Sequence, residues 1–143
     1  MSVRARVGIV VVVVGGIAFG LTRVIFPLPP NMPAPPSGLL PYFVFLDVVA
    51  DLLFGLGIAF LVFGYPLMRR AGQTAGVTVG AYASIAFLLL NWWPHANLHM
   101  VTGLDFNKIL WIDYAFHLPL FVSAAVVAFF FVRTVGQPRV SER

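Results

Sequence analysis

Two groups of polar residues interrupt a chain that is otherwise strongly apolar. All three histidines, His95, His99 and His117, fall between residues 91 and 117, together with all three tryptophans. Two pairs there are spaced four residues apart: His95 with His99, and Asp113 with His117. Side chains at this spacing lie on one face of a helix, so each pair can hold one ligand. Imidazole nitrogens and carboxylate oxygens suit zinc, copper or non-haem iron.

The other polar group consists of Asp47 and Asp51, again four residues apart. Both lie inside an apolar run, where a charged side chain costs at least about 2.5–3.5 kcal/mol on insertion scales. Acids in such a position normally face the protein interior and find a partner there. The chain offers Arg23, a protonated His117 or a bound cation. One arginine cannot neutralise all four aspartates, which favours a bound cation or protonated acids.

We therefore predict a transition-metal site near one membrane face. Counting about 1.5 Å per helical residue from the outer ends of the apolar runs places Asp51 and His117 at similar depths. The expected ligands are His95, His99, His117, Asp51 and Asp113, and the expected ion-pairing or hydrogen-bonding partners are Asp47, Asn91 and Arg23. A haem b held by His99 and His117 is the less favoured cofactor, because carboxylates crowd the site.

The elements that must position these residues are membrane helices. The chain has 143 residues, of which 60% are hydrophobic and 10% charged, and its mean hydropathy is +0.95. Soluble domains carry about 25% charged residues, so the composition predicts an all-α integral membrane protein forming a single domain. The absence of cysteine excludes disulfides and thiolate metal sites.

The apolar runs predict a four-transmembrane-helix antiparallel bundle. The expected spans are residues 7–26, 42–65, 74–93 and 107–132, joined by outer loops 27–41 and 94–106 and followed by a tail, 133–143. Prolines crowd the first outer loop, which therefore cannot be helical. Pro94 suits the first turn of a short interfacial helix in the second outer loop. Gly16 and Gly20 predict a flat strip for close helix packing.

Arginine and lysine positions predict the orientation. With the N-terminus inside, the inner side carries Arg4, Arg6, Arg69, Arg70, Arg133, Arg139 and Arg143, and the outer side carries Arg23 and Lys108. Cytoplasmic segments of membrane proteins are enriched in these residues, so both termini are expected in the cytoplasm. The expected location is the inner membrane of a bacterium or archaeon. No basic face for nucleic acid is expected.

Three functions remain open from the sequence. The first is a metal-binding or accessory subunit of a membrane complex, or a homo-oligomer, because the chain has almost no mass outside the bilayer. The second is a metal-dependent membrane enzyme, a hydrolase or oxidoreductase acting on a lipid or quinone. The third is a purely structural bundle, whose buried acids pair with Arg23 and His117.

Overall fold

The computed structural model describes residues 1–136, and this part of the chain forms six helices and no strand. The helices are α1 (Val3–Ile25), α2 (Leu40–Phe63), α3 (Tyr65–Arg69), α4 (Ala75–Leu90), α5 (Trp92–Thr102) and α6 (Phe106–Val135). The prediction of an all-helical chain is confirmed. Two of the arginines used for the orientation, Arg139 and Arg143, lie outside the described residues.

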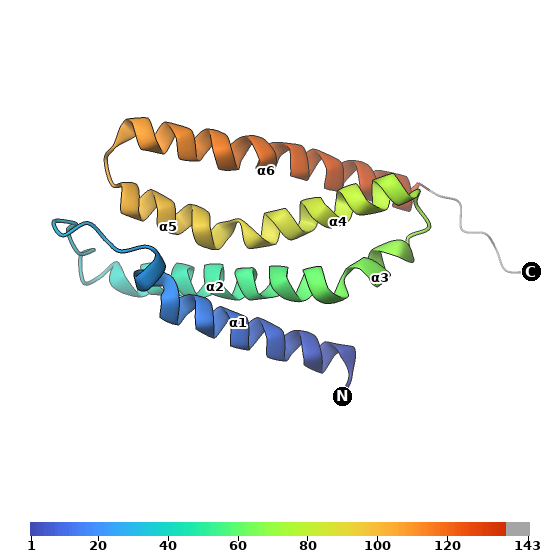
Figure 1. The fold of residues 1–143 in the computed structure, drawn as a ribbon, viewed down its shortest axis with the longest axis horizontal. Helices are drawn as coiled ribbons and strands as arrows, with labels where there is room; N and C mark the ends of the chain where they lie inside the picture. Colours follow the sequence, from blue (N-terminus) through green and yellow to red (C-terminus); the bar gives the residue numbers. More distant parts are fainter. Residues whose placement is uncertain (137–143) are drawn as a thin grey trace, which may run out of the picture.

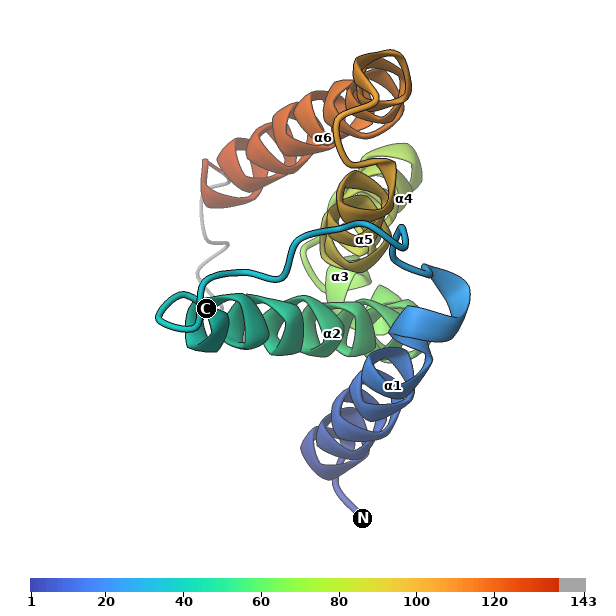
Figure 2. The same cartoon turned by 90° about the vertical axis from the view of Figure 1, so that its left-hand side faces the viewer.

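The long helices pack side by side in a row (Figures 1 and 2). Helix α1 packs on α2, α2 packs on α4 and α5, and α6 packs on the opposite side of that pair. Figure 1 shows neighbouring helices running in opposite directions, so the start of α1, helix α3 and the end of α6 lie toward the same end of the bundle along the helix axes. The connections between α1 and α2 and between α5 and α6 lie at the other end.

Three helices are long and apolar enough to cross a membrane, namely α1, α2 and α6. Helices α4 and α5 would form a fourth span if the bent pair is taken as one. Helix α4 alone has 16 residues, or about 24 Å at 1.5 Å per residue, which is less than the roughly 30 Å of a hydrocarbon core. The structure therefore supports a membrane protein with three to four spanning helices.

The helix expected within residues 94–106 is present, but it packs between other helices and does not lie across the end of the bundle. Helix α5 begins at Trp92, continues from α4 after a 42° bend, and packs between α2 and α6. The bend has a local cause, because Pro94 lacks the N–H that would bond to the carbonyl of Leu90. The chain therefore bends at Asn91, which places the α5 side chains between α2 and α6.

Small residues make the closest helix contacts. A Cβ added at Gly55 would collide with the Val11 carbonyl oxygen, and one at Gly15 would lie 3.1 Å from the Asp51 carbonyl oxygen. These two glycines let the α1 and α2 backbones approach directly, as small residues do in membrane helices. Gly16 and Gly20, expected from the sequence to form this contact, face open space instead.

Candidate metal centre

Helices α5 and α6 bring the three histidines and Asp113 together. His95 and His99 share one face of α5, and Asp113 and His117 share the facing side of α6. Ligand atoms of His95, Asp113 and His117 all lie within 4.8 Å of one another, which is the spacing of a group that can hold a metal ion. The four residues come from two helices that are joined by only three residues, so the connection is short.

Four side chains of this cluster contact one another directly. The His99 Nε2 lies 3.0 Å from the His95 Nε2 and 3.3 Å from the Asp113 Oδ1. The His117 Nδ1 lies 3.4 Å from the same Asp113 oxygen. The His95 ring also meets the His117 ring edge to face, with centroids 4.9 Å apart. Asp113 is therefore the acid that joins the histidines of both helices.

Two of these separations are close to those of ligand atoms around a four-coordinate ion. Bonds of about 2.0–2.1 Å to a tetrahedral metal place neighbouring ligand atoms about 3.3–3.4 Å apart. The distances from Asp113 to His99 and His117 match that spacing, and the contact between His95 and His99 is slightly shorter. His99 is not in the mutually close group of three, but it contacts two of its neighbours.

The cluster is partly open on the α6 side. The side chains of His99, Asp113 and His117 are 34%, 38% and 43% exposed. A groove of about 200 Å³ runs along α6 beside Asp113 and His117, and its other walls are Leu110, Tyr114, Leu118 and Phe121. An apolar molecule in that groove would lie against the apolar atoms of Asp113 and His117.

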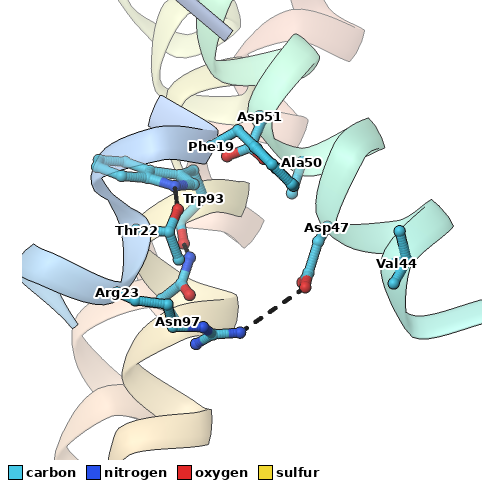
Figure 3. A pocket seen from close by; sticks show the side chains of 9 residues that line it. All are labelled: Phe19, Thr22, Arg23, Val44, Asp47, Ala50, Asp51, Trp93 and Asn97. Atoms are coloured by element: carbon cyan, nitrogen blue, oxygen red, sulfur yellow. Dashed lines mark hydrogen bonds and ion pairs between the residues drawn. The ribbon is translucent and has the colours of Figure 1, made fainter. Parts of the chain in front are cut away.

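The remaining predicted site residues lie elsewhere. Asp51, Asp47 and Arg23 line a different cavity, between α1, α2 and α5 (Figure 3). Arg23 Nη2 lies 3.8 Å from Asp47 Oδ2, which makes the expected ion pair. Asp51 is not in the group whose ligand atoms converge. Asn91 is buried at the bend between α4 and α5, and its side-chain oxygen has no hydrogen-bond partner.

Two polar residues of that cavity, Thr22 and Asn97, were not assigned a role from the sequence, and Trp93 was expected to be an interfacial aromatic like Trp92 and Trp111. The Trp93 indole N–H donates to the Thr22 hydroxyl oxygen at 2.9 Å, so this tryptophan points inward. Trp92 and Trp111, by contrast, are 51% and 74% exposed, as interfacial tryptophans are. The available signal was the four-residue spacing of Trp93 and Asn97, which puts both on one face of α5.

Comparisons with known proteins do not assign a family. No protein-family model matches the chain, and neither a curated protein nor a solved structure matches it. The geometry of the two polar regions is therefore what indicates the function.

That geometry bears on the structural alternative as well. Asp47 pairs with Arg23, and Asp113 contacts His117, as expected for acids that only hold helices together. Such pairing does not require His95 and His99 to converge on the same acid. It also leaves Asp51 without a partner for its buried Oδ1.

Proposed function

We propose that this chain is a membrane-embedded metal-binding protein that serves as a subunit of a larger membrane assembly. His95, Asp113 and His117 bind the ion, and His99 supplies a fourth nitrogen. The ligand set of imidazoles and one carboxylate suits zinc, copper or iron. The observation that carries the proposal is the mutual approach of the three ligand atoms within 4.8 Å, from two helices.

The centre lies near the outer membrane face in this proposal, and both termini are cytoplasmic. Its support is the distribution of basic residues. The start of α1, helix α3 with the residue after it, and the end of α6 lie at the opposite end of the helix axes from the α5–α6 connection (Figure 1), and they carry Arg4, Arg6, Arg69, Arg70 and Arg133. Basic residues favour the cytoplasmic side. A subunit role follows from the small extramembrane mass, which offers little surface for independent chemistry.

The absence of native cysteine makes the orientation directly testable. Ser37→Cys lies in the connection between α1 and α2, and Gln73→Cys lies between α3 and α4. In intact cells, a membrane-impermeant maleimide should label the Ser37→Cys variant, and should label Gln73→Cys only after permeabilisation. The reverse labelling pattern would place the metal centre on the cytoplasmic side.

One observation favours a second function, a metal-dependent enzyme acting on a lipid or quinone. The apolar groove on α6 is lined in part by apolar atoms of Asp113 and His117, so a membrane-dissolved molecule can lie next to the centre. A metal there would act as a Lewis acid or redox centre. Within this function the protein supplies the apolar groove that orients the substrate and the carboxylate of Asp113 beside the reacting group.

The deciding experiment is elemental analysis with an absorption spectrum on protein purified in mild detergent without chelators. A variant with His95→Ala, His99→Ala and His117→Ala is compared with an Asp51→Asn control, which changes an acid outside the cluster. We expect about one equivalent of a transition metal in the wild type and the control, and almost none in the triple variant.

Two results would overturn the metal proposal. The first is a metal-free wild type that also fails to take up zinc, copper or iron when each is added. The second is equal metal content in wild type and triple variant, which would show adventitious binding elsewhere. An intense Soret band, lost in the triple variant, would replace a single ion by haem.

A further inference from the structure

The cavity between α1, α2 and α5 is a second polar site, separate from the metal centre. Its volume is about 290 Å³, and Figure 3 shows Asp47 and Asp51 of α2 on one side, with Thr22 and Arg23 of α1 and Asn97 of α5 on the other. A single ion or water needs much less space. Cavities for small organic ligands begin at roughly 300 Å³, so this one fits a molecule of a few heavy atoms.

Two buried acceptors in the cavity lack a donor. Asp51 is 4% exposed and Asn97 is 5% exposed, and the Oδ1 atom of each has no hydrogen-bond partner. The amide nitrogen of Asn97 already donates to the Trp93 carbonyl at 2.8 Å, which leaves its oxygen as the free group. Leaving buried acceptors unpaired is costly, and more so within a membrane.

Two donors that the chain places around the cavity, the Thr22 hydroxyl and the Trp93 indole N–H, are committed to other acceptors. The Thr22 hydroxyl donates to the Ala18 carbonyl at 2.8 Å, and the Trp93 N–H donates to Thr22. Arg23 approaches Asp47 at 3.8 Å, which is an ion pair too long to be a hydrogen bond. Among the described residues no donor, Arg23 included, bonds to the Oδ1 of Asp51 or Asn97, so a ligand with its own N–H or O–H groups can satisfy both.

The charges of the cavity select the kind of donor. Its lining contains two carboxylates, Asp47 and Asp51, against one guanidinium, Arg23. With both acids ionised, the lining carries a formal excess of one negative charge and attracts a cation. The walls also include Phe19 and Trp93, whose rings accept both apolar groups and cations.

We propose that this cavity binds a primary ammonium group carried on a short apolar stem. An ammonium has three N–H donors, which match the oxygens of Asp51 and Asn97 and the carboxylate of Asp47. The stem lies against Phe19 and Trp93. Two sources present this chemistry at a membrane surface, a free amine and the headgroup of an aminophospholipid.

The test uses n-butylammonium as the probe and the full chain in lipid nanodiscs of phosphatidylcholine and phosphatidylglycerol. Heat of binding is measured by titration in phosphate buffer, because amine buffers would compete, and protein-free discs give the background. We expect saturable binding of butylammonium. The neutral analogue 1-butanol and sodium ions should neither bind saturably nor displace it.

Three variants locate the binding. Asp51→Asn should weaken butylammonium binding about tenfold or more, because the charge on the hydrogen-bond acceptor is lost. Asn97→Leu should weaken it about threefold to tenfold without changing charge. Asp105→Asn, at an exposed acid outside the cavity, should leave it unchanged. Elution as a single species and an unchanged helical circular dichroism spectrum verify folding, and Asn97→Leu carries the test if Asp51→Asn does not fold.

Replacing phosphatidylcholine by phosphatidylethanolamine distinguishes the two sources. A raised apparent dissociation constant for butylammonium in those discs identifies the lipid headgroup as a competitor at the site, and an unchanged value identifies a free amine. The proposal is overturned if Asp51→Asn and Asn97→Leu both bind butylammonium like the wild type, or if butanol or sodium binds equally well. Metal content is unaffected by either result, because the two sites share no residue.

Discussion

The two polar regions of this protein differ in how their polar side chains are paired. Between α5 and α6, the histidines and Asp113 contact one another. The side chains of His99, Asp113 and His117 are about one-third to two-fifths exposed. Between α1, α2 and α5, the most buried acid, Asp51, has an oxygen with no partner. In the first region the polar side chains contact one another, and in the second region a buried acceptor has no partner.

The difference follows from residue chemistry. Imidazole can donate, accept or ligate, so three histidines and one carboxylate can satisfy one another or a metal. The Oδ1 atoms of an ionised Asp51 and of Asn97 are both acceptors, so these two atoms cannot pair with each other. The first region can thus be satisfied within itself or by an ion, whereas the second leaves two acceptors open to an incoming donor.

The largest expected effect comes from breaking the first region alone. His117→Ala should lower metal affinity by at least about 100-fold, more than the 10- to 100-fold typical of losing an outer hydrogen-bond partner. Asp51→Asn should leave metal affinity unchanged, because that acid lies in the other cavity. Titration with a competing chelator measures both. Equal losses in the two variants would mean that the regions form one site.

The next largest effect is expected from disrupting the packing of α1 against α2 beside the second region. Gly55→Ala places a methyl group against the Val11 carbonyl and should destabilise the protein by about 1–3 kcal/mol. The control Gly16→Ala adds its methyl to open space. Denaturation in mixed detergent measures the free energy of unfolding. Metal content should persist in Gly55→Ala, since α1 does not contribute to the metal centre.

A larger loss in Gly16→Ala than in Gly55→Ala would contradict the packing. It would indicate that the open face of α1 is covered in the membrane, for example by a second copy of the chain. The oligomeric state of both variants, measured by light scattering in detergent, would then identify the contact.

A smaller effect tests whether Trp93 forms part of the wall of the second region. Trp93→Phe removes the hydrogen bond to Thr22 while keeping an aromatic ring beside Phe26 and Phe54. It should cost about 0.5–1.5 kcal/mol of unfolding free energy. The exposed Trp92→Phe is the matched control and should change stability by less than about 0.5 kcal/mol. The same detergent denaturation separates them, and equal costs would remove Trp93 from the cavity wall.

The smallest expected effect lies outside both regions, at the start of α6. Asp105 accepts from the Lys108 backbone N–H at 3.2 Å and approaches the Lys108 ammonium at 3.0 Å. The hydrogen bond from the Lys108 side chain, and then that from its backbone, lower the pKa of Asp105 below its ordinary 3.8. A carboxyl with a lowered pKa stabilises the folded state above that ordinary value, and this contribution is lost as the pH falls further.

Asp105→Ala should therefore lower the thermal midpoint slightly at pH 7 and less so at pH 3. Asp105→Asn keeps an acceptor for the helix N-terminus and should fall between the wild type and Asp105→Ala at pH 7. A loss from Asp105→Ala that grows on acidification would contradict the sign of the linkage.

Much of the helical framework could be predicted from local composition. The spans expected at residues 7–26, 42–65 and 107–132 correspond closely to α1, α2 and α6. Their ends follow from prolines, caps and charges that act within one turn. Asp105 caps α6 through its side chain. The bend that joins α4 to α5 was not predicted, because Pro94 was placed in the first turn of a separate helix in the loop, where a missing N–H costs no hydrogen bond.

The candidate site could be predicted only in part, for a related reason. The pairing of His95 with His99 and of Asp113 with His117 follows from helical spacing, which the sequence displays. The inclusion of Asp51 depended on its depth alone. The depth of a residue in the membrane can be obtained by counting residues along its helix, but its position relative to the other helices cannot.

The sequence by itself determined an apolar helical protein, the helices that carry its polar residues and the spacing that pairs them. Only the tertiary structure decided that α6 lies on the far side of α5 from α1 and α2, which separates the histidines from Asp51. It also decided that Gly15 and Gly55, instead of Gly16 and Gly20, meet between α1 and α2. The physical reason is that hydropathy and spacing act along one helix, whereas the rotation and neighbours of a helix are set by packing between helices.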